Sequence, residues 1–175
     1  MRDDLDRRLA RVRAVAMDVD GVLTDAGMYY ANSGEWLKKF HTRDGMGIAL
    51  LMRIGVRVAW ISGESSPLIR RRARKLGVTD LYLGTVRKGA ALGMLLKKHR
   101  IPAADAVYIG DDLNDLPAMA RTGIPVAVRS AVPEVRRSAA WVTRLRGGEG
   151  AVREVADRIL KAKKVNPADF FREAT

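Results

Sequence analysis

The carboxylates best suited to chemistry close a short apolar stretch near the start of the chain. Residues 12–19 (V-R-A-V-A-M-D-V) are mostly apolar, and Asp18 and Asp20 lie two residues apart at their end. In a strand, residues two apart point to the same face, and two bare carboxylates there repel unless a cation lies between them or one stays protonated. The chain has no cysteine and no histidine nearby, so oxygen ligands and Mg²⁺ are favoured, with Asp111 as a further ligand.

These residue types suit phosphoryl transfer, which depends on positioning and on charge neutralisation. We expect Asp18 to attack phosphorus and Asp20 to protonate the leaving alkoxide and then activate water. Ser62 and a backbone N–H near Gly63 would hold phosphoryl oxygens, and Lys88 would neutralise the developing charge. The sequence therefore predicts a phosphatase that forms a covalent intermediate on Asp18.

The elements that must position these residues follow from apolar runs that alternate with helical patterns. We expect a hairpin over about residues 27–41, around Asn32, Ser33 and Gly34, and a tail over about 164–175. The predicted strands are 12–19, 56–61, 81–83, 106–109, 124–128 and 140–143, and the predicted helices are 44–55, a segment from Gly63 to Leu76, 88–99, 113–121, 133–138 and 150–163.

Strands that alternate with helices indicate βαβ units and a parallel sheet. We therefore predict one Rossmann-like α/β domain over residues 1–175, with helices on both faces of the sheet. Asp18, Ser62 and Asp111 each follow a predicted strand. Because the carboxyl ends of such strands meet at one crevice, these side chains should lie together.

Each signal also has an ordinary structural interpretation. Ser62 and Gly63 alone form a plain turn, and Lys88 alone could be a surface lysine at a helix start. Asp111, Asp112 and the following acidic residue could simply cap a helix. Their joint occurrence, in order and each at a strand end, favours catalysis.

At these residues the sequence resembles the haloacid dehalogenase-type phosphatases. Residues 18–25 (D-V-D-G-V-L-T-D) resemble the first motif of that family, Ser62 the second, Lys88 the third, and residues 110–115 (G-D-D-L-N-D) the fourth. The resemblance implies a nucleophile at Asp18, an acid/base at Asp20, and Mg²⁺ held by Asp18, the backbone of Asp20 and Asp111. It also implies that Asp112 and Asp115 support the metal site.

Two further segments resemble the 3-deoxy-D-manno-octulosonate (KDO) 8-phosphate phosphatase group, which includes relatives that act on 2-keto-3-deoxynononate (KDN) 9-phosphate. They are residues 36–48 (W-L-K-K-F-H-T-R-D-G-M-G-I) and 146–154 (R-G-G-E-G-A-V-R-E). The resemblance implies a capless homotetramer in which a neighbouring subunit partly covers the site. The stretches between the motifs are too short for a cap domain.

The sequence also bears on whether the sugar acid of the substrate has eight or nine carbons. Glu64, Arg72 and Lys75, together with Thr42, resemble the KDN 9-phosphate branch, whereas residues 43–48 (R-D-G-M-G-I) look more like the KDO type. Arg72 and Lys75 are three residues apart on one helix face and could hold a substrate carboxylate, or they could simply be solvated. We lean towards the nine-carbon substrate, with KDO 8-phosphate of lipopolysaccharide synthesis as the alternative.

Composition limits the other function classes. The net charge of +12 could attract a small anionic sugar-acid phosphate or a nucleic acid, or reflect solvated basic helix faces. Most of the ten aromatic residues lie in apolar or hairpin patterns rather than between lysines and arginines, so we expect no nucleic-acid platform. No segment has the apolar length of a membrane span and no signal pattern opens the chain, so we expect no membrane association and a cytoplasmic location. A remaining alternative is a non-catalytic regulator with this fold.

Overall fold

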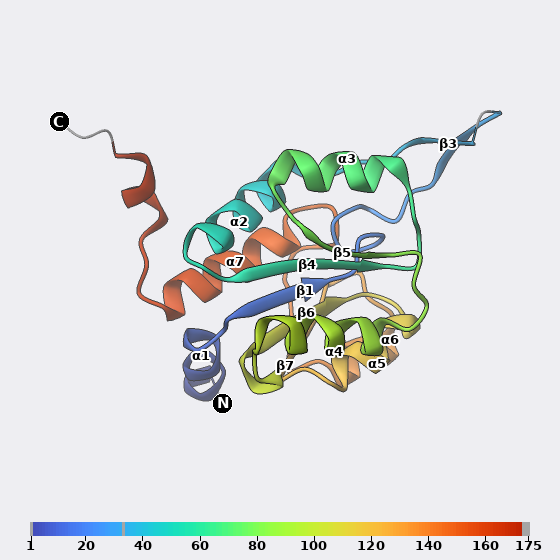
Figure 1. The fold of residues 1–175 in the computed structure, drawn as a ribbon. Coiled ribbons are helices and arrows are strands. Elements are labelled where there is room, and N and C mark those ends of the chain that lie inside the picture. Colours follow the sequence, from blue (N-terminus) through green and yellow to red (C-terminus); the bar gives the residue numbers. More distant parts are fainter. Residues whose placement is uncertain (1, 33, 173–175) are drawn as a thin grey trace.

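The apolar runs of the sequence form a six-stranded parallel sheet in the computed structural model, which describes residues 2–32 and 34–172 (Figure 1). The strand order is β5-β4-β1-β6-β7-β8. The strands are β1 (Ala14–Met17), β4 (Arg57–Ser62), β5 (Asp80–Leu83), β6 (Ala106–Gly110), β7 (Ile124–Ala127) and β8 (Trp141–Val142). Strands β1 and β6 are buried along their whole length, as expected for a parallel sheet covered on both faces.

Helices cover both faces of this sheet, which confirms the predicted α/β class. On one face lie α2 (Thr42–Arg53), α3 (Pro67–Leu76) and α7 (Ala151–Ala162), and on the other α4 (Lys88–His99), α5 (Leu116–Met119) and α6 (Pro133–Ser138) (Figure 1). Helix α1 (Arg2–Ala10) packs against α7. Short 3₁₀ segments lie at Ala103–Asp105, Leu113–Asp115 and Pro167–Phe171. In the described chain no helix is long and apolar enough to span a bilayer.

The chain reverses its direction across the sheet beside β1. From β1 it continues outward to β4 and β5, and it then returns to β6, on the other side of β1, before β7 and β8. Met17 at the end of β1 pairs in register with Trp60 of β4 and with Ile109 of β6. The crevice at such a reversal is the usual ligand site of an open α/β sheet, so the ends of β1 and β6 should hold the chemistry.

A hairpin of β2 (Tyr29–Ala31) and β3 (Gly34–Leu37) leaves the body of the domain after β1 (Figure 1). This confirms the predicted hairpin, although Ser33 of its turn lies outside the described residues. Within the predicted hairpin of about residues 27–41, β3 ends at Leu37, and the next side chain, Lys38, turns inward and is buried. Phe40 stacks on Trp60, with ring centroids 6.4 Å apart, and so packs on its own domain.

Other boundaries also differ from those predicted. The helix expected at 113–121 is a 3₁₀ turn followed by one turn of α5, because a capping box joins Asp112 to Asp115 and Pro117 starts the next turn. The tail expected from residue 164 contains the 3₁₀ segment Pro167–Phe171, which Asn166 caps. Between β1 and β4 the described chain forms only the hairpin and α2, in agreement with the predicted absence of a cap domain.

Candidate active site

The ends of β1 and β6 bring together the carboxylates that the sequence singled out. Asp18 directly follows β1 and Asp111 directly follows β6. Each of these two residues and Asp115 places one carboxylate oxygen within 4.8 Å of the other two. Asp18 is 5 % exposed and Asp115 is fully buried. The predicted convergence of the first and fourth motifs is therefore present in the fold.

Lys88 lies at the first position of α4 and is completely buried at this cluster. Its Nζ lies 2.9 Å from Oδ2 of Asp18 and 2.8 Å from Oδ1 of Asp115. Burial alone would lower the pKa of Lys88, but these two carboxylates raise it above its ordinary value. Lys88 is thus a fixed cation beside the proposed nucleophile.

Asp115 organises the fourth motif and has no free lone pair for a cation. Its Oδ1 accepts hydrogen bonds from Lys88 and from the Tyr108 hydroxyl, at 2.8 and 2.7 Å. Its Oδ2 accepts from the backbone N–H groups of Asp111 and Asp112, at 2.9 and 3.3 Å. Four donors saturate a carboxylate. This arrangement fits the predicted supporting role of Asp115.

Asp112 supports the same loop from outside. Its carboxylate accepts a hydrogen bond from the backbone N–H of Leu113 at 2.7 Å and caps the 3₁₀ turn. Its side chain is exposed, unlike those of Asp18 and Asp115. Asp112 therefore holds the loop shape and lies outside the carboxylate cluster.

The electrostatics of the cluster call for a cation. Burial, with the nearby charge of Asp115, raises the pKa of Asp18 to about 7, although Lys88 opposes the shift. Burial, with the charges of Asp18 and Asp115, raises the pKa of Asp111 to about 8. A divalent cation between Asp18 and Asp111 would favour the ionised form of both.

The donor set also fits Mg²⁺. Oδ1 of Asp111 is buried and has no hydrogen-bond partner among the described residues. Asp18 offers carboxylate oxygen, and the described chain has no histidine nitrogen within this cluster. Mg²⁺ prefers such oxygen ligands. The residues that would hold it are Asp18 and Asp111, with the backbone carbonyl of Asp20 as the third protein ligand that the family resemblance implies.

Two glycines let three segments approach closely around the cluster. Gly21 has a φ of +89°, and a Cβ there would lie 1.9 Å from Oδ2 of Asp111. A Cβ on Gly147 would lie 1.7 Å from the carbonyl oxygen of Gly21. The loop before α7 therefore packs directly against the loop of the first motif.

Asp20 makes a contact that the sequence did not predict. Its Oδ1 lies 2.6 Å from Nζ of Lys38, which also lies 2.7 Å from Oε1 of Glu35. The hairpin thus reaches back to the proposed acid/base. The sequence carried no signal for this, because Lys38 and Lys39 are adjacent and only the fold shows which one turns inward. Tyr108 was also missed, since it is one apolar residue among others in a buried run.

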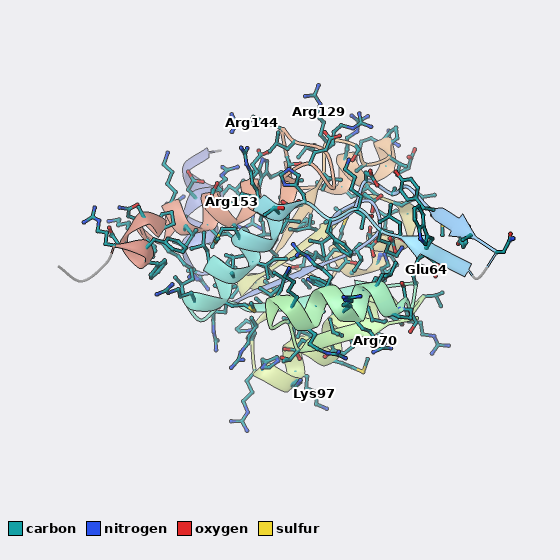
Figure 2. All side chains as sticks on the ribbon, turned by 90° about the horizontal axis from the view of Figure 1, so that it is seen from above. Glu64, Arg70, Lys97, Arg129, Arg144 and Arg153 are labelled. Atoms are coloured by element: carbon teal, nitrogen blue, oxygen red, sulfur yellow. The ribbon has the colours of Figure 1, made fainter. Side chains whose placement is uncertain are left out.

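The remaining predicted residues lie in varied surroundings. Ser62 is buried at the end of β4, and its Oγ accepts a hydrogen bond from the backbone N–H of Glu64 at 3.0 Å. Gly63 and Glu64 are exposed, and Glu64 lies between the start of α3 and the hairpin (Figure 2). Thr42, at the first position of α2, is exposed as well.

The two residues predicted to clamp a substrate carboxylate, Arg72 and Lys75, both lie on α3. The Arg72 guanidinium lies 5.8 Å from the ring centroid of Phe40, and a Cβ on Gly45 would meet it at 2.5 Å. Lys75 is exposed. Among the described residues, no ion pair joins Arg72 or Lys75 to the Asp18 cluster. Their role in substrate binding stays a prediction.

Known proteins resemble this chain over most of its length. A family model described as haloacid dehalogenase-like hydrolase matches residues 61–154. A 3-deoxy-D-manno-octulosonate 8-phosphate phosphatase of Yersinia pestis is 45% identical over 161 residues, which cover 92% of this chain and 86% of that protein.

Solved structures agree with this likeness. The phosphatase of the same name from Moraxella catarrhalis, in complex with magnesium, phosphate and KDO, superposes with a TM-score of 0.92 at 36% identity, covering 98% of each chain. The cobalt-bound enzyme from Haemophilus influenzae has a TM-score of 0.91 at 40% identity, covering 94% of this chain and 99% of the other.

Proposed function

Because the chain belongs to the haloacid dehalogenase-like hydrolases, we propose that it hydrolyses KDO 8-phosphate to KDO and phosphate through a covalent intermediate on Asp18. The predicted family and the predicted phosphatase class are both confirmed by its relatives. The observation that carries the proposal is the contact between Asp18 and Lys88 at the ends of β1 and β6, beside the carboxylate of Asp111.

The substrate is the point on which the sequence prediction changes. The lean towards KDN 9-phosphate is not supported, because the similar proteins are named for KDO 8-phosphate and one is solved with KDO. That lean depended on Glu64, Arg72, Lys75 and Thr42, and of these four Arg72 lies over the ring of Phe40. The eight-carbon alternative is therefore the one that we propose.

The reaction follows from the roles that these side chains can fill. A carboxylate oxygen of Asp18 attacks phosphorus, and the bond from phosphorus to the ester oxygen breaks. Asp20 gives its proton to the departing alkoxide, then takes a proton from water, which attacks the phosphoryl group and frees Asp18. Ser62 and Lys88 bind the phosphoryl oxygens. The chemistry that bound magnesium supplies is neutralisation of the charge between the carboxylates and the phosphate.

An assay of phosphate release tests this proposal. The protein with Mg²⁺ should release phosphate from KDO 8-phosphate with a higher kcat/KM than from KDN 9-phosphate. Asp18→Asn should lower kcat by more than about 1,000-fold and leave the free energy of unfolding nearly unchanged, because an amide cannot act as the nucleophile. An Asp18→Asn protein with full magnesium-dependent activity would refute the mechanism.

We also propose a homotetramer, in which a neighbouring subunit partly covers the site. Support comes from the apolar side chains that the hairpin exposes, with Trp36 69% and Tyr30 66% exposed. Met28, Tyr29 and Leu37 are exposed beside them. An apolar group of this size on a soluble domain is typical of a subunit interface.

A further inference from the structure

Lys38 lies at the junction of the hairpin and the catalytic crevice. It directly follows β3, yet its side chain is only 1% exposed. The ammonium group lies between two carboxylates, at 2.6 Å from Oδ1 of Asp20 and 2.7 Å from Oε1 of Glu35. A buried lysine with two anionic partners is held in one position, since each partner fixes one of its donors.

Glu35 is itself fixed from the other side. Its Oε2 accepts a hydrogen bond from the hydroxyl of Ser66. Ser66 caps α3, where its Oγ accepts from the backbone N–H of Leu68 at 3.2 Å. The chain of contacts from Ser66 through Glu35 and Lys38 to Asp20 therefore anchors the proposed acid/base to a helix of the domain body.

The two oxygens of Asp20 differ in their surroundings. Oδ1 accepts the hydrogen bond of Lys38, whereas Oδ2 is buried and has no hydrogen-bond partner in the part of the chain that the structure describes. Oδ2 is thus the oxygen with free capacity to give or take a proton. A carboxylate without an anchor could rotate about its side-chain torsions and lose this orientation.

We propose that Lys38, held by Glu35, is a positioning residue that fixes the carboxyl group of Asp20, which in its protonated form gives a proton to the leaving group and as a carboxylate then takes one from water. The inference rests on the proposed function, since Asp20 must be the acid/base. It assigns to the hairpin a part in the reaction in addition to any part in subunit contact.

Two variants of adjacent lysines separate this role from a general effect of charge. Lys38→Met removes the ammonium from Asp20, whereas Lys39→Met removes an exposed ammonium that pairs with Asp25 at 3.2 Å. With KDO 8-phosphate, we expect Lys38→Met to lower kcat by about 100-fold and to change KM by less than about three-fold. Lys39→Met should match the wild type.

The dependence on the leaving group gives a second readout. The nitrophenolate of p-nitrophenyl phosphate leaves without a proton, so the first step should survive in Lys38→Met, while water attack on the phosphorylated Asp18 stays slow. We expect a burst of nitrophenolate equal to the enzyme concentration, followed by slow turnover. If Lys38→Met only damaged the structure of the site, the burst and the steady-state turnover would slow to the same extent. That result would overturn the proposal.

Chemical rescue tests the ammonium itself. The chain has no cysteine, so Lys38→Cys introduces its only thiol. Alkylation of the unfolded variant with 2-bromoethylamine, followed by refolding, restores an ammonium at nearly the lysine position, and iodoacetamide adds a neutral group of similar size. We expect the kcat of the 2-bromoethylamine product to be at least about ten-fold higher than that of the iodoacetamide product. Equal activities would contradict the proposal.

The outcomes keep the two proposals apart. If the wild type hydrolyses neither ester in the presence of Mg²⁺, the proposed function fails. If the wild type is active and Lys38→Met equals it, only the role of Lys38 fails.

Should Lys38→Met not fold, Glu35→Gln decides, because its amide oxygen still accepts a hydrogen bond while the anion is lost. We expect a kcat loss between those of Lys39→Met and of the iodoacetamide product, and wild-type activity would count against the proposal.

Discussion

Asp18 and Asp111 place two carboxyl groups at short range, and neighbouring residues make this arrangement possible. Lys88 places a buried ammonium against Asp18. The backbone N–H of Asp111 donates a hydrogen bond to the carboxylate of Asp115, which holds this part of the loop in place. Gly21 leaves the space in which the carboxylate of Asp111 lies. A side chain at position 21 would therefore act on the metal site directly.

Gly21→Ala should abolish catalysis. The new Cβ would overlap the Asp111 carboxylate, so kcat/KM should fall by at least about 100-fold and the Mg²⁺ concentration for half-maximal activity should rise. The matched control is Gly55→Ala, whose φ of +79° carries the same backbone strain but whose Cβ would meet nothing within 4 Å. That variant should lose about 1 kcal/mol of unfolding free energy and keep its activity. Equal activity losses in both variants would count against this account.

Tyr108→Phe tests the support of the fourth motif. It removes the hydroxyl that donates to Oδ1 of Asp115 at 2.7 Å and leaves the ring in place. We expect the free energy of unfolding to fall by about 1.5–3 kcal/mol, the range for a hydrogen bond to a charged group. Urea denaturation measures this, with Tyr82→Phe as the control, because the Tyr82 hydroxyl makes no hydrogen bond among the described residues. A loss no larger than that of Tyr82→Phe would show that the bond is unimportant.

The sequence indicated the residues of the cluster but not their partners. Asp18, Lys88 and Asp111 were predictable because each follows a recognisable strand or opens a helix, so the topology alone brings them together. Tyr108 and Lys38 were not, because their roles depend on which way one side chain turns in the folded protein. The spacing of apolar residues, every two in a strand or every 3.6 in a helix, does not show which polar partner a side chain meets.

At the scale of elements, α7 is tied to α2 by a side chain rather than by its own cap. Asp44 of α2 is buried, and its carboxylate accepts hydrogen bonds from the backbone N–H groups of Gly150 and Arg153, at 3.3 and 2.7 Å. Burial raises the pKa of Asp44, and these backbone donors oppose the shift. The same loop presses Gly147 against Gly21, so the cap of α7 also positions the catalytic loop.

Asp44→Ala should destabilise the protein by about 1–2 kcal/mol, as does the loss of other helix caps. The matched control is Asp157→Ala on the surface of α7, which breaks an exposed pair with Arg153 at 2.7 Å and should cost less than about 0.5 kcal/mol. Chemical denaturation of both variants measures the difference. Similar losses in the two variants would rule out a special role for Asp44.

The order of strands and helices was predictable, whereas several element ends were not. Apolar runs between the helical patterns identified all six strands of the sheet, because buried parallel strands are continuous apolar segments in the sequence. The expected helix at 113–121 failed because Asp112 and Asp115 satisfy local backbone donors and favour a 3₁₀ turn. The end of β3 at Leu37 also depends on a long-range contact, the one between Lys38 and Asp20.

At the scale of the whole molecule, basic residues lie on more than one side, and eight of them line one groove: Arg8, Arg43, Arg129, Arg144, Arg153, Arg158, Lys161 and Lys164. Arg129, Arg144 and Arg153 project on one side of the molecule, and Arg70 and Lys97 on the opposite side (Figure 2). A nucleic-acid site usually gathers such residues into one stripe. The expected absence of a nucleic-acid interface therefore stays a prediction, which a gel shift at physiological salt would test.

The hairpin is where the proposed assembly can be tested. Trp36→Lys should dissociate the tetramer, because a charge in an apolar interface loses its hydration. Sedimentation velocity would measure the assembly, with Val86→Lys as the control, since Val86 is 84% exposed and lies outside the hairpin. A wild type that sediments as a monomer would contradict the proposed assembly.

The most direct test of the central claim is to identify the residue that carries the phosphoryl group. The protein is mixed with KDO 8-phosphate and Mg²⁺, quenched in acid during turnover, and treated with borohydride, which reduces an acyl phosphate to an alcohol. Peptide mass spectrometry should then find homoserine in place of Asp18, and only in samples that received substrate. Reduction of another carboxylate, or of none in an active enzyme, would contradict nucleophilic attack by Asp18.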